Sequence, residues 1–321
     1  MHAAVIEQAH TPPVLAEIAD PPATAGLHLV RVAAAALSHV TRSRAAGRHY
    51  SAAPGRHLVP GVDGSGRLED GRRVYFLLPE APYGSMAERT LVAPANCIEL
   101  PAALSDVTAA AIGIPGMSSW AALTQRARMV AGATVLVNGA TGMSGRLAVQ
   151  IARRLGAARV IATGRDAAAL AALESLGADA TIALGQPAAA LSQALQAQFG
   201  RGVDIVLDYL WGPSAEAILE AAARAAPAGR ALRHVQIGTA GGADIRLDGA
   251  VLRSSAIELL GSGLNSVPPE RLRDSIRALF ASAADDPFEA PVRQEPLARV
   301  AELWDMPGAC PRIVFTTADR P

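Results

Sequence analysis

The segment Val135–Gln150, VLVNGATGMSGRLAVQ, places three glycines between an apolar run and a helical pattern. Gly142 and Gly145 hold the second and third positions of the dinucleotide fingerprint G-x-G-x-x-G, and Ala140 stands at the first. The second glycine lets the backbone approach a pyrophosphate, and the third lets the helix pack closely on the strand. Alanine at the first position needs only a negative φ, so it does not block the turn. The segment therefore predicts a phosphate-binding turn at a helix N-terminus, with a packing turn in an unrelated α/β domain as the alternative.

Short apolar runs alternate with helical patterns around this segment. The runs are TVLVN, ARVIAT, ATIAL, VDIVLD, RHVQIG and AIELLG. Strands that alternate with helices imply crossover connections and a parallel sheet with both faces covered. After the glycine turn, Leu147, Ile151 and Leu155 recur at four-residue spacing, as on one face of a helix. The six runs predict an α/β fold with a doubly wound Rossmann domain.

The sequence on either side of this pattern has a different character. The first hundred residues contain short strands such as HLVRVAAAAL and RRVYFLL between frequent prolines and glycines, which is typical of a β-barrel. DVTAAAIGIPGMSSWAAL predicts helices joined by a turn at Pro115-Gly116, while PPERLRDSIRALF and EPLARVAELW predict helices and RIVFTT a closing strand. We expect a barrel-like catalytic domain in residues 1–117, a Rossmann domain in residues 118–262 and a return to the catalytic domain in residues 263–321.

Composition narrows the classes of function. The 321 residues are half apolar and carry 29 basic and 29 acidic side chains, so neither a nucleic acid nor a membrane is expected as a partner. Only Cys97 and Cys310 are present, which excludes a disulfide framework and a four-cysteine zinc lobe and favours a cytoplasmic location. We find no signal-peptide pattern at the N-terminus and no apolar run of membrane-spanning length.

The end of the second predicted strand indicates which dinucleotide binds. A NAD-binding fold usually carries an acid there, about twenty residues after the turn, that holds the ribose 2′-hydroxyl. Here Gly164 takes that position and Arg165 follows it. A charge-assisted contact between arginine and a phosphate contributes roughly 1.5–3 kcal/mol, which favours NADPH over NADH. We interpret the adjacent Asp166 as the N-cap of the next helix.

Several motifs, spread over nearly the whole chain, agree with the predicted fold and the predicted cofactor. They include NGATGMSG, LAVQIARRLGAARVIATGRD, LESLGAD, PGVDGSG, QIGTAGG and ELLGSG. The motifs resemble those of the zinc-independent medium-chain dehydrogenase/reductases, in the NADPH:quinone oxidoreductase-like group. In that group the turn commonly reads A-x-x-G-x-x-G, and Gly139 stands at its opening place. The resemblance implies a chaperonin-10-like β-barrel domain interrupted by a Rossmann domain, with the active site in the cleft.

The resemblance also implies contacts to NADPH, carried over one position at a time. Ser118 matches a small hydroxyl residue beside the nicotinamide or the phosphates, and Leu210 matches a residue that covers the ribose. The other matched positions are Thr141, Gly142, Met143 and Ser144 in the pyrophosphate turn, and Gly238, Gly261 and Ser262 in loops that line the nicotinamide. The strand in ELLGSG matches one that pairs across a homodimer, so a homodimer is expected.

The positions that match the zinc ligands of the alcohol dehydrogenases hold other residues. Ser38 stands where their cysteine would stand and Val62 where their histidine would stand, which leaves Asp63 as one carboxylate. A serine and one carboxylate do not make a zinc site, so no metal is expected. We expect Asp63 to hold a turn or to pair with an arginine. The segment Ser38-His39-Val40-Thr41 also departs from the N-x-x-D of the quinone reductases.

Without a metal, hydrogen-bond donors must stabilise the negative charge that hydride transfer builds on the acceptor, or the acceptor must already be electrophilic. His39 is a candidate donor because imidazole titrates near neutrality, and Ser38 and Tyr50 are further catalytic candidates. Their structural alternatives are a hydrogen bond at a barrel edge, a spacing role and partly buried packing. Trp211 is expected to line the cleft or to pack, and both cysteines are expected to be inert.

Three functions stay open from the sequence. The first is a zinc-free, NADPH-dependent oxidoreductase that transfers hydride to quinones or α,β-unsaturated carbonyls. The second is a carbonyl reductase or dehydrogenase of a biosynthetic intermediate, and the third is a non-catalytic NADPH-binding protein. The glycine turn and Arg165 support cofactor binding in all three. Only the residues around the acceptor separate them.

Overall fold

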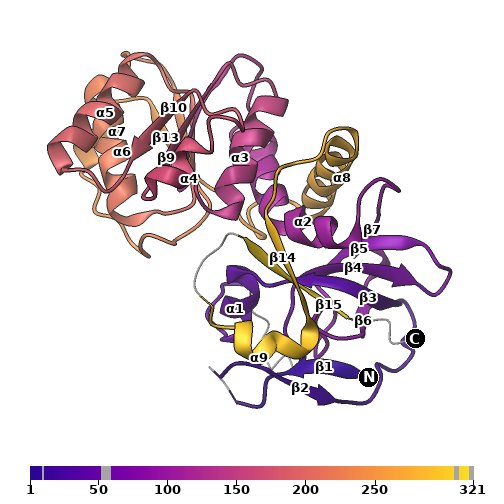
Figure 1. Cartoon of the computed structure of the whole chain (residues 1–321). Helices are drawn as coiled ribbons and strands as arrows, with labels where there is room; N and C mark the ends of the chain where they lie inside the picture. The colour runs from indigo at the N-terminus through magenta and orange to yellow at the C-terminus, as the bar shows by residue number, and fades with distance from the viewer. Residues whose placement is uncertain (9–10, 52–58, 307–310, 318–321) are drawn as a thin grey trace. The chain divides into compact units, whose positions relative to one another are not determined.

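A computed structural model describes residues 1–8, 11–51, 59–306 and 311–317 (Figure 1). The chain divides into two units, residues 1–114 with 276–321, and residues 115–275. The domain boundaries expected at 117/118 and 262/263 stay predictions. The first lies after, and the second before, the corresponding division of the structure.

The second unit contains a six-stranded sheet, as the six apolar runs predict. Its strands are β8 (Thr134–Asn138), β9 (Arg159–Gly164), β10 (Ala180–Ala183), β11 (Ile205–Asp208), β12 (Leu232–Gln236) and β13 (Ile257–Gly261). All neighbouring pairs are parallel, and the order is β10-β9-β8-β11-β12-β13. The strand order reverses between β8 and β11, and ligands of doubly wound folds bind in the crevice outside the carboxyl ends at such a point. The doubly wound prediction is confirmed.

Helices alternate with these strands. They are α3 (Met143–Arg154), α4 (Ala167–Ala171), α5 (Ala188–Gly200), α6 (Gly212–Ala225) and α7 (Gly249–Arg253). Leu147 and Ile151 are fully buried on α3, and Gly156 follows that helix with a φ of 89°, as expected for a helix end. Leu195 and Phe199 of α5 share one buried cluster with residues of α6 and of the sheet. Burial of these apolar faces fixes the carboxyl ends of the strands on a rigid core.

The first unit is built on a largely antiparallel sheet. Seven strands form it: β3 (His28–Ala36), β4 (Asp63–Leu68), β5 (Arg73–Leu77), β6 (Arg89–Val92), β7 (Cys97–Glu99), β14 (Val292–Pro296) and β15 (Arg312–Thr316). Among the described strands of this sheet only β14 and β15 pair in parallel, and β15 pairs with β3, so residues 312–316 join the sheet built from the N-terminal part of the chain. A second small sheet consists of β1 (His2–Val5) and β2 (Val14–Glu17).

The remaining elements are short helices and two longer ones. They are α1 (His39–Ala45), η1 (Pro94–Asn96), α2 (Asp106–Ala121), the π-helix η2 (Ala122–Arg126), α8 (Pro269–Asp285), η3 (Leu297–Arg299) and α9 (Val300–Leu303). The amphipathic α8 is confirmed, because Leu272, Ile276, Leu279 and Phe280 are buried along it. The helix expected in EPLARVAELW is wrong in its first half, where Glu295 and Pro296 end β14. Proline lacks an N–H and disfavours helix at the preceding residue, so helical structure begins only at Leu297.

The expected turn at Pro115-Gly116 is also wrong, because α2 runs through it. An interior proline costs about 3 kcal/mol, and burial of Ile112 and Met117 on either side offsets that cost. With η2 this helix covers Asp106–Arg126, which is long and apolar enough to cross a membrane, contrary to the length expected from the sequence. Of its most apolar window, 67% is buried inside the protein, which is typical of a core helix.

Candidate active site

The glycine turn follows β8 and opens with Gly139, not Ala140. Gly139 has a φ of 87°, a conformation that favours glycine, whereas Ala140 is not among the residues of positive φ. The N–H of Ala140 donates to the carbonyl of Thr163 at 2.8 Å, and the N–H of Gly139 donates to the Thr163 hydroxyl at 3.3 Å. The alanine at the first fingerprint position therefore fits the turn, as predicted.

Gly145 brings helix α3 onto the strand. A Cβ on Gly145 would lie 2.4 Å from the carbonyl oxygen of Gly139 and 2.5 Å from the Cα of Ala140. The packing role predicted for the third glycine is confirmed. Gly142 is the N-cap of α3 and provides no capping side chain, so the first N–H groups of this twelve-residue helix are available to an anion. The roles of Thr141, Gly142, Met143 and Ser144 toward a phosphate stay predictions.

The end of β9 is closely packed at Gly164. A Cβ on Gly164 would lie 2.5 Å from Cγ2 of Thr141, so any larger residue there would require the Thr141 side chain to move. Arg165 is exposed, and within the described residues its guanidinium makes no hydrogen bond or ion pair. Asp166 caps α4 by accepting the N–H of Ala169 at 2.9 Å, which confirms its predicted role. Within the described part of the chain, Arg165 is thus an unpaired cation beside the turn.

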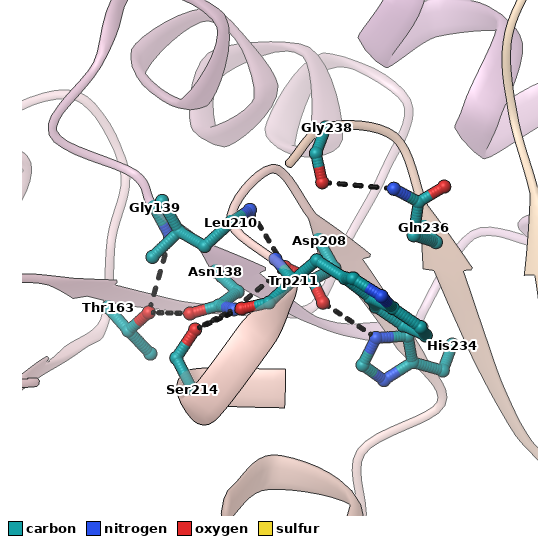
Figure 2. A network of polar contacts seen from close by, with 10 residues as sticks. All are labelled: Asn138, Gly139, Thr163, Asp208, Leu210, Trp211, Ser214, His234, Gln236 and Gly238. Atoms are coloured by element: carbon teal, nitrogen blue, oxygen red, sulfur yellow. Dashed lines mark hydrogen bonds and ion pairs between the residues drawn. The ribbon is translucent and has the colours of Figure 1, made fainter. Parts of the chain in front are cut away.

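A buried hydrogen-bond network joins residues of four neighbouring strands (Figure 2). Asn138 of β8 donates to Oδ1 of Asp208 in β11 at 2.8 Å and to the hydroxyl of Ser214 at 2.9 Å. The Thr163 hydroxyl donates to Oδ1 of Asn138 at 2.7 Å. Nε2 of His234 in β12 contacts Oδ2 of Asp208 at 3.0 Å. Asn138, Thr163, Asp208 and His234 are fully buried.

Asp208 also organises the loop that follows β11. Its Oδ1 accepts the backbone N–H groups of Leu210 and Trp211, both at 2.9 Å. Burial alone raises the pKa of Asp208, but the hydrogen bonds from His234, Trp211 and Leu210 more than offset it and hold the pKa below its ordinary value. Sequence reasoning did not propose Asp208 or His234 as functional residues. The available indication was a histidine at a central position of a predicted strand, between Leu232 and Gln236.

The loop after β11 has a strained backbone. Trp211 has φ 59° and ψ −157°, a region that is essentially restricted to glycine and that costs other residues about 1–3 kcal/mol. Its indole ring meets the His234 ring edge-on, with ring centroids 6.0 Å apart. The Leu210 side chain lies against Gly139, since a Cβ there would come 2.8 Å from Cγ of Leu210. The loop therefore contacts the phosphate turn through Leu210.

The other expected cofactor residues also lie in the second unit. Ser118 donates its hydroxyl to the carbonyl of Pro115 at 2.8 Å. Its neighbour Ser119 is fully buried and contacts the Tyr209 hydroxyl at 2.7 Å. Its Oγ also lies within hydrogen-bond distance of two carbonyl oxygens, that of Pro115 at 3.0 Å and that of Ser144 at 3.3 Å. The link from α2 to the phosphate turn therefore runs through Ser119, a residue that the sequence did not single out.

Gly238, Gly261 and Ser262 lie at the carboxyl ends of β12 and β13. The N–H of Gly238 donates to the carbonyl of Asp208, and its own carbonyl accepts from Gln236 (Figure 2). The carbonyl of Gly261 accepts from Arg126, and the N–H of Ser262 donates to the carbonyl of Gln236. Apart from Ser118, which lies on α2, the expected cofactor positions follow or end strands of the parallel sheet at their carboxyl ends. Their contacts to NADPH stay predictions.

The three catalytic candidates lie in the first unit. Ser38 is the N-cap of α1, where its Oγ accepts the N–H of Thr41 at 3.0 Å and contacts the Thr41 hydroxyl at 2.9 Å. His39 begins that helix and is exposed, although partial burial of its ring, then Arg42 and Arg312, lower its pKa. Tyr50 is 62% exposed with its ring 4.3 Å from that of His49, so partly buried packing does not describe it. Their catalytic roles stay predictions.

Asp63 is fully buried in the sheet of the first unit. Its Oδ2 accepts the Tyr75 hydroxyl at 3.0 Å, and its Oδ1 has no hydrogen-bond partner in the described part of the chain. Burial raises the pKa of Asp63 to about 6, against the opposing influence of Arg312 and Tyr75. The expected turn is wrong, because Asp63 lies in strand β4. The expected arginine partner holds as a charge interaction with Arg312, while Tyr75 is the hydrogen-bond partner.

The residues at the matched zinc positions do not fit a metal. Val62 is apolar and buried, the Ser38 oxygen caps a helix, and Asp63 holds a tyrosine. Across residues 1–8, 11–51, 59–306 and 311–317, no group of three or more His, Cys, Asp or Glu side chains is placed to hold a metal ion. Cys97 is a half-buried free thiol whose pKa burial raises to about 11, as expected of an inert thiol. Cys310 lies outside the described residues.

Comparisons with known proteins cover both units. Residues 145–281 match the family described as zinc-binding dehydrogenase. A protein of Emericella nidulans described as a probable NADPH-dependent quinone reductase is 30% identical, over 95% of this chain and 96% of that protein. Quinone oxidoreductase of Pongo abelii is 37% identical over 33% of this chain and 35% of that protein. The solved quinone oxidoreductase of Thermus thermophilus, also solved in complex with NADPH, gives a TM-score of 0.80 at 27% identity, covering 99% of this chain and 100% of that chain.

Proposed function

Because the chain belongs to the medium-chain dehydrogenase/reductase family, in its NADPH:quinone reductase-like group, we propose that it is a zinc-free reductase that uses NADPH and delivers hydride to quinones or α,β-unsaturated carbonyls. It is an enzyme of the quinone oxidoreductase type. The names of the similar proteins support NADPH as cofactor and a quinone as acceptor. The free thiol of Cys97 supports the further proposal of a reducing, cytoplasmic setting.

The residues at the end of β9 support NADPH over NADH as the cofactor. After the turn that would hold the pyrophosphate, strand β9 ends in Gly164, which has no acidic side chain. Arg165 follows it, with an exposed guanidinium that has no partner among the described residues. An acid at Gly164 would bind a ribose 2′-hydroxyl and repel a 2′-phosphate, whereas Arg165 would attract that phosphate. The N–H groups at the start of α3 would hold the pyrophosphate.

Hydride transfer does not need a metal ion as Lewis acid if the acceptor is already electrophilic. NADPH, when bound, supplies the hydride. Quinones and conjugated carbonyls then need a hydrogen-bond donor for the oxygen on which negative charge develops. We propose His39 for this role, with Ser38 and Tyr50 as neighbours that orient the acceptor. The lowered pKa keeps His39 largely neutral above pH 7, so its N–H would donate a hydrogen bond.

We also propose that the enzyme is a homodimer. Strand β13 lies at the edge of the six-stranded sheet, and an edge strand can pair with a strand of a second copy. Leu259 of this strand is 39% exposed, so its apolar side chain would be covered by pairing. Both features support association through β13.

Replacing Arg165 tests the cofactor assignment directly. We expect Arg165→Ala to weaken NADPH binding about ten- to hundredfold, because one charge-assisted phosphate contact is lost, and to leave NADH binding within about twofold. Isothermal titration of each dinucleotide measures the two dissociation constants. Arg201→Ala removes another exposed arginine, beyond the end of α5, and serves as the matched control. Equal weakening of NADPH and NADH by Arg165→Ala would reject the assignment.

The acceptor class needs a separate assay. NADPH oxidation with quinones and conjugated enones, but with little turnover of saturated ketones, is expected. Turnover confined to saturated ketones would identify a carbonyl reductase instead.

A further inference from the structure

Asp208 and His234 form a buried pair whose position in the fold is not explained by packing alone. Both side chains are fully buried at neighbouring strands of the parallel sheet, and Val206 of β11, not Asp208, is the residue directly paired with His234. An apolar side chain at His234 would fill the space without a polar group. Instead Nδ1 of His234 is buried with no hydrogen-bond partner among the described residues, which is unfavourable. We therefore expect the hydrogen bond of its other nitrogen, Nε2, to offset this free-energy cost.

The partner of Nε2 is Asp208. Nε2 of His234 lies 3.0 Å from Oδ2 of the carboxylate, while Oδ1 accepts Asn138 and two backbone N–H groups (Figure 2). Because a carboxylate only accepts, Nε2 carries the hydrogen and His234 is the donor. The four donors together fix both oxygens of Asp208. Loss of the His234 donor would leave Oδ2 without a partner among the described residues.

The fixed carboxylate in turn sets the backbone of the loop after β11. Its Oδ1 holds the N–H groups of Leu210 and Trp211, and the hydroxyl of Ser214 donates to the carbonyl of Trp211 at 3.2 Å. Trp211 adopts a conformation that favours glycine, so it persists only because its surroundings hold it. The same geometry places Leu210 against Gly139, the opening residue of the phosphate turn.

We propose that His234 and Asp208 are positioning residues for the cofactor: they fix the Leu210–Trp211 loop against the phosphate turn and thereby set the affinity for NADPH without touching it. The inference rests on the NADPH-dependent function proposed above. His234 is far from the phosphate turn in sequence and is fully buried, so neither property alone indicates a role in cofactor binding. The proposed role concerns the affinity for NADPH and not the stability of the fold, because it acts through the Leu210–Trp211 loop.

A pair of substitutions at one position separates positioning from packing. His234→Leu fills the space but removes the donor, and we expect it to weaken NADPH binding about tenfold. His234→Gln keeps an N–H donor, and we expect it to restore the dissociation constant to within about threefold of the unaltered chain. Leu232→Ala opens the core of the same strand without touching the network, so it should lower the melting temperature and leave NADPH affinity within about twofold.

NADPH titration followed by nicotinamide fluorescence measures affinity, and thermal unfolding without NADPH measures stability. Two results would overturn the inference while leaving the proposed function intact. One is an unchanged affinity for NADPH in His234→Leu. The other is a loss of affinity in both His234→Gln and Leu232→Ala that is as large as the loss in His234→Leu. Failure of the unaltered chain to bind NADPH would instead overturn the proposed function, and this inference with it. If His234→Leu does not fold, Ser214→Ala tests the same loop from a partly exposed position. We expect it to weaken NADPH about threefold, and unchanged affinity would overturn the inference.

Discussion

Among the described residues each unit buries one aspartate completely, and the two carboxylates behave in opposite ways. Asp208 of the second unit receives hydrogen bonds from His234, Asn138 and two backbone N–H groups, and its pKa lies below the ordinary value. Asp63 of the first unit receives one, from Tyr75, and burial raises its pKa to about 6. Equal burial thus gives opposite shifts, because the number of donors decides which protonation state the fold favours.

The two shifts have opposite consequences for stability against pH. The raised pKa of Asp63 means that the folded state binds more protons than the unfolded state between about pH 4 and pH 6. Its stabilising contribution is complete below the unfolded pKa near 3.8 and is lost as pH rises through about 6. The depressed pKa of Asp208 gives the reverse: its contribution is present above pH 3.8 and is lost as pH falls through the folded pKa.

Asp208→Asn is expected to have the largest effect. Asparagine keeps an oxygen for the N–H groups of Leu210 and Trp211, but it presents an N–H group to Nε2 of His234. One buried donor then loses its acceptor, and the charge-assisted hydrogen bonds weaken. We expect the free energy of unfolding at pH 7.5 to fall by about 3 kcal/mol, as for other buried carboxylates that lose their partners. Urea unfolding measures this free energy. A gain in stability in Asp208→Asn would contradict the claim that the hydrogen-bond donors favour the ionised form of Asp208.

Asp63→Asn is expected to act in the opposite direction. Asparagine resembles the protonated acid that the fold prefers, and it still accepts the Tyr75 hydroxyl. A shift from 3.8 to about 6 corresponds to about 3 kcal/mol, so we expect a gain of about 2 kcal/mol in unfolding free energy at pH 7.5. The gain should shrink as pH falls toward 4, where Asp63 itself is protonated. Urea unfolding at both pH values measures it, and a loss of stability at pH 7.5 would show that Arg312 stabilises the carboxylate more than burial penalises it.

The comparison also shows how much of each unit could be predicted from sequence. In the second unit a local pattern determines much of the site: the glycines of the turn, the crowded Gly164 and the capping Asp166 all lie within one strand–helix–strand stretch of the chain. The His234–Asp208 pair could not be predicted in this way. The two residues are 26 positions apart, and only the parallel register of β11 and β12 brings them together.

In the first unit the local pattern was less informative. Ser38 and His39 were proposed for their side-chain chemistry, but the serine hydroxyl is engaged in capping α1, which depends on where that helix begins. Asp63 contacts Tyr75 because β4 and β5 pair in an antiparallel register, with Asp63 opposite Leu77. The continuous α2 across Pro115 likewise depends on burial by distant segments. Local sequence motifs therefore could not predict side-chain contacts that depend on the pairing of distant segments.

Tyr75→Phe is expected to give the smallest effect and to sharpen the account of Asp63. Phenylalanine fills the same core position but removes the one hydroxyl that donates to the carboxylate. The ionised acid then has no donor among the described residues, so we expect a loss of about 1–1.5 kcal/mol in unfolding free energy at pH 7.5. At pH 4 the acid is largely neutral and the loss should be less than about half as large.

A double-mutant cycle isolates the Tyr75–Asp63 contact. In an Asp63→Asn background the Tyr75 hydroxyl donates to a neutral amide oxygen, and a neutral hydrogen bond is weaker than a charge-assisted one. Tyr75→Phe should therefore cost less there than in the unaltered chain at pH 7.5, and both backgrounds should give similar costs at pH 4. A cost that is the same in both backgrounds at both pH values would mean that Tyr75 contributes only packing. The raised pKa of Asp63 would then reflect burial and Arg312 alone, and the number of donors would no longer explain the contrast with Asp208.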